Sequence, residues 1–326
     1  MSIEYPTRPA WENLRHFNRM SCEPRLGLLT KTSERKEQLR NQVRWFRLAH
    51  GNLAEFLPRI TDSSDGDEPF ITMEWLAMPT LAELFMAATL PAKAWSGVVS
   101  KLQYILAQMA SHTVQSPLAS GMARAMYVDK TRDRLAEFVL ANPLSAAHHV
   151  LQAGRRIDLM TVLAQLDRFV EQAGLLDIDR LCPVHGDFCF SNILLAPEGG
   201  VIKMIDPRGE FGSPGLQGDP RYDLAKLAHS FSGGYDFIVA DRFSVELADD
   251  GELCSSSGMT SCHAPIADIF SSVFLSNPVL AHQVRAIEAL LFLSMLPLHS
   301  DQPRRQLAML ATGLTLFGQC QAQIVP

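Results

Sequence analysis

Several features are missing from this 326-residue sequence, and each absence excludes a class of protein. Low-complexity tracts are missing, while 47% of the residues are apolar and 20% are charged, so the chain is expected to fold throughout. The strongest apolar run, Ala289 to Leu298, is too short to span a bilayer and contains Pro297, which favours a buried helix. Residues 1–11 lack the apolar core of a secretory signal, so a cytoplasmic location without membrane insertion is expected.

Concentrated positive charge is also absent. The net charge is −6, and the lysines and arginines are scattered along the chain. Since a basic face supplies most of the non-specific affinity for DNA and RNA, we expect no nucleic-acid partner.

Paired cysteines are absent as well. The six cysteines never form a C-x-x-C pair, and a chain of this length does not need disulfides, so free thiols are expected. Cys262 precedes His263, which raises the alternative of structural zinc, but the nearest other ligand is Cys254 in a serine-rich stretch. The sequence therefore favours a loop over residues Asp249 to Ala264.

The first part of the chain predicts a small α/β lobe over residues 1–76. Residues 25–32 have strand character. A helix is expected next, ending near Gly51, because apolar residues recur at the spacing of one helix face, namely Leu39, Val43 and Phe46.

A hairpin is expected at the end of this lobe. Residues 56–60 and 69–75 have strand character and flank the acidic turn Asp62 to Glu68. A calcium loop is the alternative, but the acidic spacing does not match an EF-hand and the liganding glutamate is missing. The pattern therefore favours a solvated connection.

A mainly helical lobe is predicted over residues 77–326. Thr80 and Glu83 have the spacing of a capping box that opens a helix over residues 81–88. Amphipathic helices are expected at about 92–111, 120–141 and 157–173. Short strands interrupt this pattern at 181–184, 193–195 and 201–205, after which helices are expected to the end.

The block of short strands carries residues suited to phosphoryl transfer. This reaction needs an acceptor hydroxyl held in line, a carboxylate near its proton, and Mg²⁺ on the ATP phosphates. Asp187 and Asn192 lie five residues apart across a tight loop, and Asp206 ends the last strand. Asn192 and Asp206 offer the oxygen ligands that Mg²⁺ prefers, which leaves Asp187 to orient or deprotonate the acceptor. His185 has no nucleophile–base partner nearby and is interpreted as a brace of the loop.

These motifs resemble a known family. HGDFCFSN at 185–192, ID at 205–206 and GDPRYDLAKL at 218–227 are similar to the aminoglycoside phosphotransferases, choline kinases and related small-molecule kinases. The resemblance implies a bilobal α+β fold of the protein-kinase type and an enzyme that uses ATP and Mg²⁺. It also implies that Asp187 is the catalytic-loop aspartate, that Asn192 is a magnesium ligand, and that Asp206 bridges metal and phosphates.

The sequence around this block adds a narrower resemblance. The stretch IDPRG, the segment GDPRYDLAKLAHS and the late LSMLPLHSD are similar to bacterial proteins of capsule and surface-polysaccharide biosynthesis. Arg208 belongs to this signature and is a candidate for contact with phosphate or an anionic acceptor, the alternative being an ion pair with Asp219 or Glu210. Asp219 and Asp223 flank the start of a helix and are expected to cap it.

The first lobe departs from the family pattern. No glycine-rich loop precedes Lys31, which is the candidate lysine for the α- and β-phosphates of ATP, and Gly27 is the nearest glycine. Gln42 stands where the glutamate partner of that lysine is expected, and Glu37 lies on another helix face. The stretch Met73, Glu74, Trp75 and Leu76 resembles the hinge whose backbone would bind adenine.

Three functions follow from these observations. The first is an ATP-dependent kinase that phosphorylates a hydroxyl of a sugar, amino sugar or amino alcohol. The second is a catalytically degenerate, nucleotide-binding regulatory module of a polysaccharide-assembly system, favoured by Gln42 and the missing glycine loop. The third is a kinase acting on a protein or a protein-bound sugar.

Overall fold

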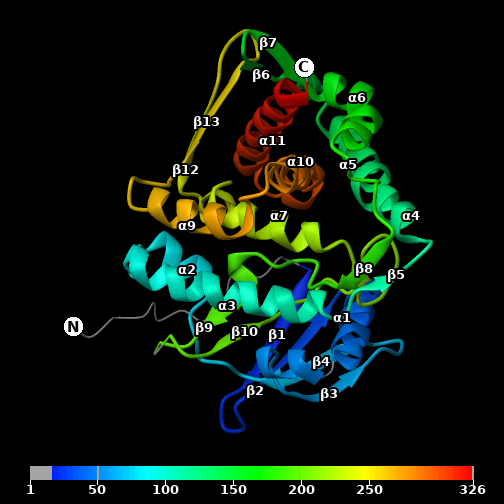
Figure 1. Cartoon of the computed structure of the whole chain (residues 1–326), viewed down its shortest axis with the longest axis vertical. Coiled ribbons are helices and arrows are strands. Elements are labelled where there is room, and N and C mark those ends of the chain that lie inside the picture. Colours follow the sequence, from blue (N-terminus) through cyan, green and yellow to red (C-terminus); the bar gives the residue numbers. More distant parts are fainter. Residues whose placement is uncertain (1–16, 50, 198, 325–326) are drawn as a thin grey trace. The chain divides into compact units, whose positions relative to one another are not determined.

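A computed structural model of the chain describes residues 17–49, 51–197 and 199–324 (Figure 1). These residues form two compact units. The first unit contains the described residues up to Gln115 together with Arg180–Asp223, and the second contains Ser116–Asp179 and the residues from Leu224 onward. The block of short strands therefore belongs to the same unit as the N-terminal sheet. The division into two sequential lobes at residues 76 and 77 stays a prediction.

The first unit begins with a four-stranded antiparallel sheet, drawn in blue in Figure 1. Its strands, in the spatial order β1-β2-β4-β3, are β1 (Asn18–Glu23), β2 (Leu28–Ser33), β4 (Phe70–Glu74) and β3 (Ile60–Ser64). Helix α1 (Lys36–Leu48) packs on this sheet through Leu39 and Val43, which join a buried cluster with strand residues Leu29, Ile71 and Met73. The helical spacing in the sequence predicted this apolar face correctly.

Two strands of this sheet differ from the prediction in their bounds. The expected strand over residues 56–60 is wrong, because the 3₁₀ helix η2 (Gly51–Phe56) ends there and β3 begins only at Ile60. Pro58 lies between them and has no N–H to donate to a strand ladder. The strand expected from residue 25 begins at Leu28, because a turn precedes it in which Gly27 has a φ of 62°. Strand β1 was not predicted.

Most of the remaining elements of the first unit were predicted, except for two short strands, Val114–Gln115 and Gln217–Gly218. Helix α2 (Leu81–Met86) opens with the expected capping box, in which the Thr80 hydroxyl accepts a hydrogen bond from the Glu83 N–H and the Glu83 carboxylate accepts one from the Thr80 N–H. After it come α3 (Ala92–Ala110), β5 (Val114–Gln115), β8 (Arg180–Pro183), η5 (Phe190–Asn192), β9 (Ile193–Leu195), β10 (Ile202–Met204) and β11 (Gln217–Gly218). The predicted block of short strands is thereby confirmed.

The second unit is mainly helical. Helices α10 (Pro278–Ser294) and α11 (Pro303–Ile324) pack against each other, and the apolar run that includes Ala289 is buried in α10 as expected. The other elements are α4 (Ala119–Arg124), the π-helical η3 (Ala125–Asp129), α5 (Lys130–Ala141), η4 (Pro143–Ala147), β6 (His149–Gln152), β7 (Arg155–Asp158), α6 (Leu159–Gln172), α8 (Tyr235–Val239), α9 (Ala264–Phe274) and η6 (Leu296–His299). Helix α7 (Pro220–Phe231) runs from the first unit into the second.

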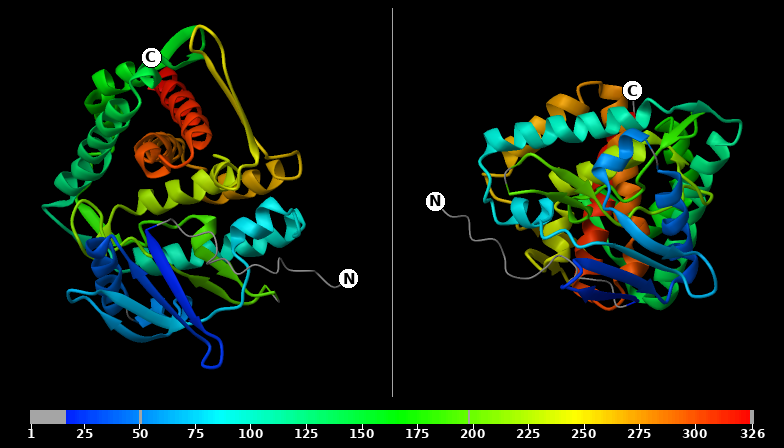
Figure 2. Two further views of the ribbon diagram at one scale, coloured as in Figure 1. Left: turned by 180° about the vertical axis from the view of Figure 1, so that it is seen from behind. Right: turned by 90° about the horizontal axis from the view of Figure 1, so that it is seen from below.

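A long hairpin contradicts the expectation that only helices follow residue 205. It pairs β12 (Phe243–Leu247) with β13 (Leu253–Ser257), and Figure 2 shows it as an extended yellow ribbon. The expected loop over residues 249–264 is therefore wrong for β13, which contains Cys254. The alternation of Phe243, Val245 and Leu247 with polar residues is a strand signal that the serine-rich partner strand obscured.

The expected fold class is confirmed. An N-terminal antiparallel sheet with one helix is followed by a larger, mainly helical part, which makes the protein α+β. Among the described residues, no helix combines the length and the apolarity needed to cross a membrane.

Candidate active site

The segment that follows β8 is held by a carboxylate from α7. The backbone N–H groups of His185 and Gly186 donate to the two oxygens of Asp223 at 2.7 and 2.8 Å. Asp223 thus fixes the loop, a role that was not expected from its position near the start of a helix. Asp219 does cap the helix start, because its carboxylate accepts the N–H of Arg221 at 2.9 Å.

Apolar side chains anchor the same loop from within. Phe188 and Phe190 are fully buried. The ring of Phe190 stacks on that of Trp95 of α3, with 5.5 Å between the ring centroids. It also meets the ring of Phe85 of α2 edge-on, with a centroid distance of 5.2 Å. The loop therefore has little freedom to move its polar residues, which is the condition for a preorganised site.

His185 is built into the loop. Its ring is completely buried, lies edge-on to Trp45 at 5.8 Å, and accepts the N–H of Asp187 at Nδ1 at 3.3 Å. Burial lowers the pKa of His185 to about 4, against the opposing charges of Asp187 and Asp206. The imidazole is therefore neutral at neutral pH.

Asp187 and Asn192 converge as the sequence predicted. The amide nitrogen of Asn192 donates to the backbone oxygen and to the carboxylate of Asp187, both at 2.9 Å. The oxygen end of the Asn192 side chain is not used in these bonds, and this is the end that a magnesium ion requires.

Asp206 is held close to this pair by the residue that precedes it. The N–H of Ile205 donates to the Asn192 backbone oxygen at 2.9 Å, and Asp206 follows it with a left-handed φ of 58°. The Asp206 side chain is 34% exposed, and its Oδ1 accepts hydrogen bonds from two residues of the N-terminal sheet and helix.

Those two residues are Lys31 and Gln42. The buried Lys31 ammonium forms an ion pair with Asp206 and donates to Oε1 of Gln42 at 2.9 Å. The Gln42 amide nitrogen donates to Asp206 at 2.7 Å. The structure thus brings Lys31, Gln42 and Asp206 together, while Glu37 is solvent-exposed and bonded to Arg40.

Helix α1 contacts the segment between Val184 and Glu210 at two further points. The indole N–H of Trp45 donates to the Val184 backbone oxygen at 2.8 Å, and Asn41 donates to Glu210 at 3.3 Å. Gly209, at a φ of 72°, lies so close to α1 that an added Cβ would be 2.3 Å from the backbone oxygen of Asn41. These contacts were not predicted from the sequence. The one available signal was a pair of polar residues, Asn41 and Gln42, beside the apolar stripe of α1.

Arg208 makes an ion pair with one of the two partners proposed for it. Its guanidinium donates to Glu210 at 3.0 Å and to the Tyr222 hydroxyl at 3.4 Å. Its backbone N–H donates to the backbone oxygen of His185 at 2.8 Å, which ties it to the loop that carries Asp187. Asp219, the other expected partner, pairs with Arg221.

The candidate hinge lies at the end of β4. Met73 is buried in the sheet, and the N–H groups of Glu74 and Trp75 donate to Arg59 and Gly27 at 2.9 and 2.8 Å. These two amides are therefore occupied. Within the described residues, no hydrogen bond engages the amides of residues 76–78, which are the next donors along the chain.

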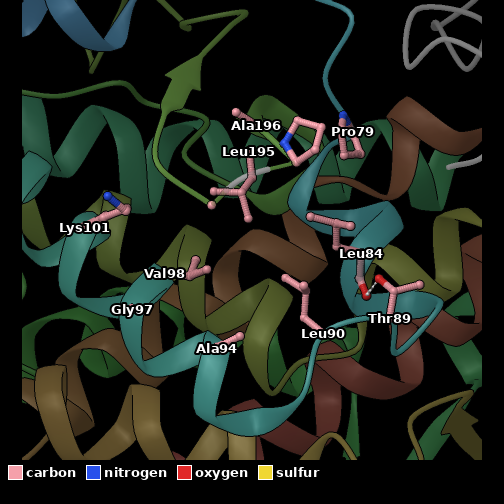
Figure 3. Close-up of a pocket in the computed structure, with 12 residues that line it drawn as sticks. Pro79, Leu84, Thr89, Leu90, Ala94, Gly97, Val98, Lys101, Leu195 and Ala196 are labelled. Carbon is pink, nitrogen blue, oxygen red and sulfur yellow. Dashed lines mark hydrogen bonds between the residues drawn. The ribbon is translucent and has the colours of Figure 1, made fainter. Parts of the chain in front are cut away.

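A small apolar pocket of about 100 Å³ lies elsewhere in the first unit (Figure 3). Leu84 of α2, Val98 of α3 and Leu195 of β9 line it. None of its lining residues belongs to the polar cluster described above. In the described part of the chain, no group of three or more His, Cys, Asp and Glu residues is arranged as a metal site.

Comparisons with known proteins place these observations in context. A family model described as "APH: Phosphotransferase enzyme family" matches residues 28–252, and no curated protein matches the chain. An ADP-bound structure of the aminoglycoside phosphotransferase APH(2'')-Ib is similar with a TM-score of 0.50 at 14% identity, covering 94% of this chain and 93% of that one. A putative fructosamine-3-kinase from Thermobifida fusca YX-ER1 has a TM-score of 0.48 at 15% identity, covering 91% of this chain and 85% of that one. The first likeness shows a shared fold.

Proposed function

Because the chain belongs to the phosphotransferase enzyme family, we propose that it is an ATP- and Mg²⁺-dependent kinase that phosphorylates a hydroxyl group of a small molecule. One observation carries the proposal. The Asp187–Asn192 pair and the Lys31–Gln42–Asp206 cluster are joined through the hydrogen bond from Ile205 to Asn192. Groups suited to an acceptor hydroxyl, a metal ion and phosphates therefore belong to one connected network.

The residues present fit a magnesium ion and a nucleotide by the chemistry of their donors. Asn192 and Asp206 would hold the metal through an amide oxygen and a carboxylate oxygen, since Mg²⁺ prefers such ligands and keeps several waters. Lys31 would bind the α- and β-phosphates. When bound, Mg²⁺ neutralises charge on the phosphates of ATP, which supplies the phosphoryl group.

The protein residues divide the remaining work. Asp187 orients the acceptor hydroxyl and accepts its proton. His185, buried and neutral, braces the loop on which Asp187 stands. Arg208 is available to an anionic group of the acceptor or to phosphate, in exchange for its ion pair with Glu210.

Adenine would be held by the segment that follows β4. Glu74 and Trp75 use their amides within the sheet, so their contribution is limited to backbone oxygens and packing. The amides of residues 76–78 are the donors that we assign to the base.

For the acceptor we propose a sugar, an amino sugar or an amino alcohol. Similar structures bear the names of aminoglycoside phosphotransferases and of a fructosamine kinase, and their names support a polyhydroxylated acceptor. A role in capsule or surface-polysaccharide biosynthesis rests on the IDPRG and LSMLPLHSD stretches of the sequence. A protein-bound sugar is the remaining variant of this acceptor class.

A degenerate, nucleotide-binding regulatory module is the alternative function. It is favoured by Gln42, which replaces the expected glutamate beside Lys31. It is disfavoured by the complete set of Asp187, Asn192 and Asp206.

The test is an assay of the purified chain with Mg-ATP and a panel of sugars, amino sugars and choline-like alcohols. ADP release and phosphorylated product would be followed together by coupled assay and mass spectrometry. Acceptor-dependent ADP release, lost in the Asp187→Ala variant, is the expected result. Nucleotide binding without turnover on any acceptor would favour the regulatory module.

A further inference from the structure

Gln42 occupies a position where its two amide ends meet groups of opposite character. Its oxygen accepts a hydrogen bond from the Lys31 ammonium at 2.9 Å, and its nitrogen donates to Asp206 at 2.7 Å. Gln42 and Lys31 are 4% and 5% exposed, so the bond between them is shielded from water, whereas the bond to Asp206, whose side chain is 34% exposed, is only partly shielded. This orientation of the amide is the one that satisfies both neighbours at once.

A carboxylate could not make the same pair of contacts. Ionised glutamate only accepts hydrogen bonds, so at this position it would bind Lys31 and repel Asp206. Glutamine instead links the lysine and the aspartate without adding charge. The difference between the two side chains therefore decides which carboxylate Lys31 neutralises.

Because residue 42 is glutamine and not glutamate, the charge of Lys31 is balanced by Asp206. Asp206 is the one carboxylate within ion-pair distance of Lys31 among the described residues. As long as this ion pair is closed, a divalent cation must compete with an ammonium group for Asp206. Phosphate oxygens, which bind the ammonium group, would release the carboxylate to the metal.

We propose that Gln42 acts as a positioning residue because it carries no charge: it leaves Lys31 paired with Asp206, and this ion pair makes binding of a divalent metal and binding of a nucleoside diphosphate or triphosphate depend on each other. The inference rests on the proposed function and extends it. Each ligand weakens the Lys31–Asp206 ion pair that opposes the other ligand. By linkage, the metal strengthens nucleotide binding by the same factor as the nucleotide strengthens metal binding.

The experiment measures Mn²⁺ binding to the full chain by electron paramagnetic resonance, with and without ADP, after correction for Mn²⁺ bound to free ADP. In Gln42→Glu, the new carboxylate takes Lys31 and frees Asp206. We expect Mn²⁺ alone to bind at least about tenfold more tightly than in the unmodified chain, and the enhancement by ADP to fall by a similar factor. Equal Mn²⁺ affinities and equal enhancement in both chains would overturn the inference.

Two further variants make the result specific. Gln42→Met has a similar length but lacks both polar ends, so the Lys31–Asp206 pair stays closed and Mn²⁺ alone should bind as weakly as in the unmodified chain. Tight Mn²⁺ binding by Gln42→Met would contradict the inference even if Gln42→Glu failed to fold. Gln38→Glu adds the same charge at an exposed position of α1 and should change neither affinity.

Different results would refute the proposed function and the proposed role of Gln42. An unmodified chain that binds neither ADP nor Mn²⁺ in any combination would refute the proposed function. An unmodified chain that binds Mn²⁺ with ADP, but whose coupling is unaltered in Gln42→Glu, would refute the role of Gln42 alone.

Discussion

The proposed catalytic loop from His185 to Asn192 and helix α1 contribute to one hydrogen-bond network in different ways. The loop is a contiguous motif whose reacting groups lie within eight residues, and it is fixed by Asp223 and by buried phenylalanines. Helix α1 supplies no proposed reacting group. It contributes alignment, through the side chains of Asn41, Gln42 and Trp45. The groups to which we assign the chemistry are thus concentrated in a short stretch of sequence, whereas their alignment depends on contacts between residues that are distant in sequence.

The largest effect is expected in the loop. Asp187→Ala should lower kcat by about 10²–10⁴-fold, because the acceptor loses its proton-accepting carboxylate. ATP binding, measured by calorimetry, should stay nearly unchanged. Asp67→Ala, in an exposed turn of the sheet, is the control and should behave as the unmodified chain. Normal turnover in Asp187→Ala would place the chemistry elsewhere.

The second effect tests the point at which the loop and the helix meet. Asp206→Ala removes the proposed metal ligand and the partner of both Lys31 and Gln42. We expect Mg-ADP affinity to fall by about 10–100-fold, together with kcat. A variant that loses turnover but binds Mg-ADP normally would show that Asp206 is not a metal ligand.

The third effect concerns the support of the loop. Asp223→Asn turns a donor toward the N–H groups of His185 and Gly186, which leaves a buried mismatch. The free energy of unfolding should fall by about 2–4 kcal/mol in urea titrations. Asp67→Asn serves as the exposed control. An unchanged midpoint would mean that the buried phenylalanines alone hold the loop.

Glu288, which lies outside both the loop and α1, is expected to make the stability of the chain depend on pH. Glu288 in α10 is fully buried, and burial raises its pKa to about 7, partly offset by Arg285. Its folded-state pKa exceeds its unfolded value, so stability is lost as pH rises from about 4.5 through 7. Glu288→Gln should therefore stabilise the chain by on the order of 1–3 kcal/mol at pH 8 and by little at pH 5. Equal gains at both pH values would exclude titration of Glu288 as the cause.

The smallest effect on turnover is expected from the helix. Trp45→Phe keeps an aromatic ring but removes the donor to Val184 and part of a fully buried side chain, so the free energy of unfolding should fall by about 1–3 kcal/mol. Because Gln42 and Asn41 stay in place, kcat/KM should fall only a few-fold. A loss as large as that of Asp187→Ala would break the distinction between chemistry in the loop and alignment in the helix.

The features of the fold and of the candidate site that could be predicted are those whose residues lie close together in the sequence. The HGDFCFSN motif, the capping box at Thr80 and the apolar face of α1 are local patterns, and the structure bears out the geometry that they implied. The resemblance to aminoglycoside phosphotransferases is confirmed by the family match, whereas those to choline kinases and to polysaccharide-biosynthesis proteins stay predictions.

Long-range contacts explain what could not be predicted. Asp223 looked like a helix cap because its bonds to a loop 37 and 38 residues earlier leave no local pattern. The contact of Trp45 with Val184 spans 139 residues. The strand alternation of β12 was present in the sequence, but the serines of β13 offered no matching apolar face.

The backbone at Asp206 limits which residues this position can tolerate. A left-handed φ of 58° is inexpensive for glycine, asparagine and aspartate and costs about 1–2 kcal/mol for most other side chains. Glycine and asparagine fit the backbone but carry no charge, while glutamate carries the charge but adds a methylene and fits the backbone less well. Aspartate is therefore the one side chain that both tolerates the left-handed backbone and supplies the negative charge. Few substitutions at position 206 should be tolerated.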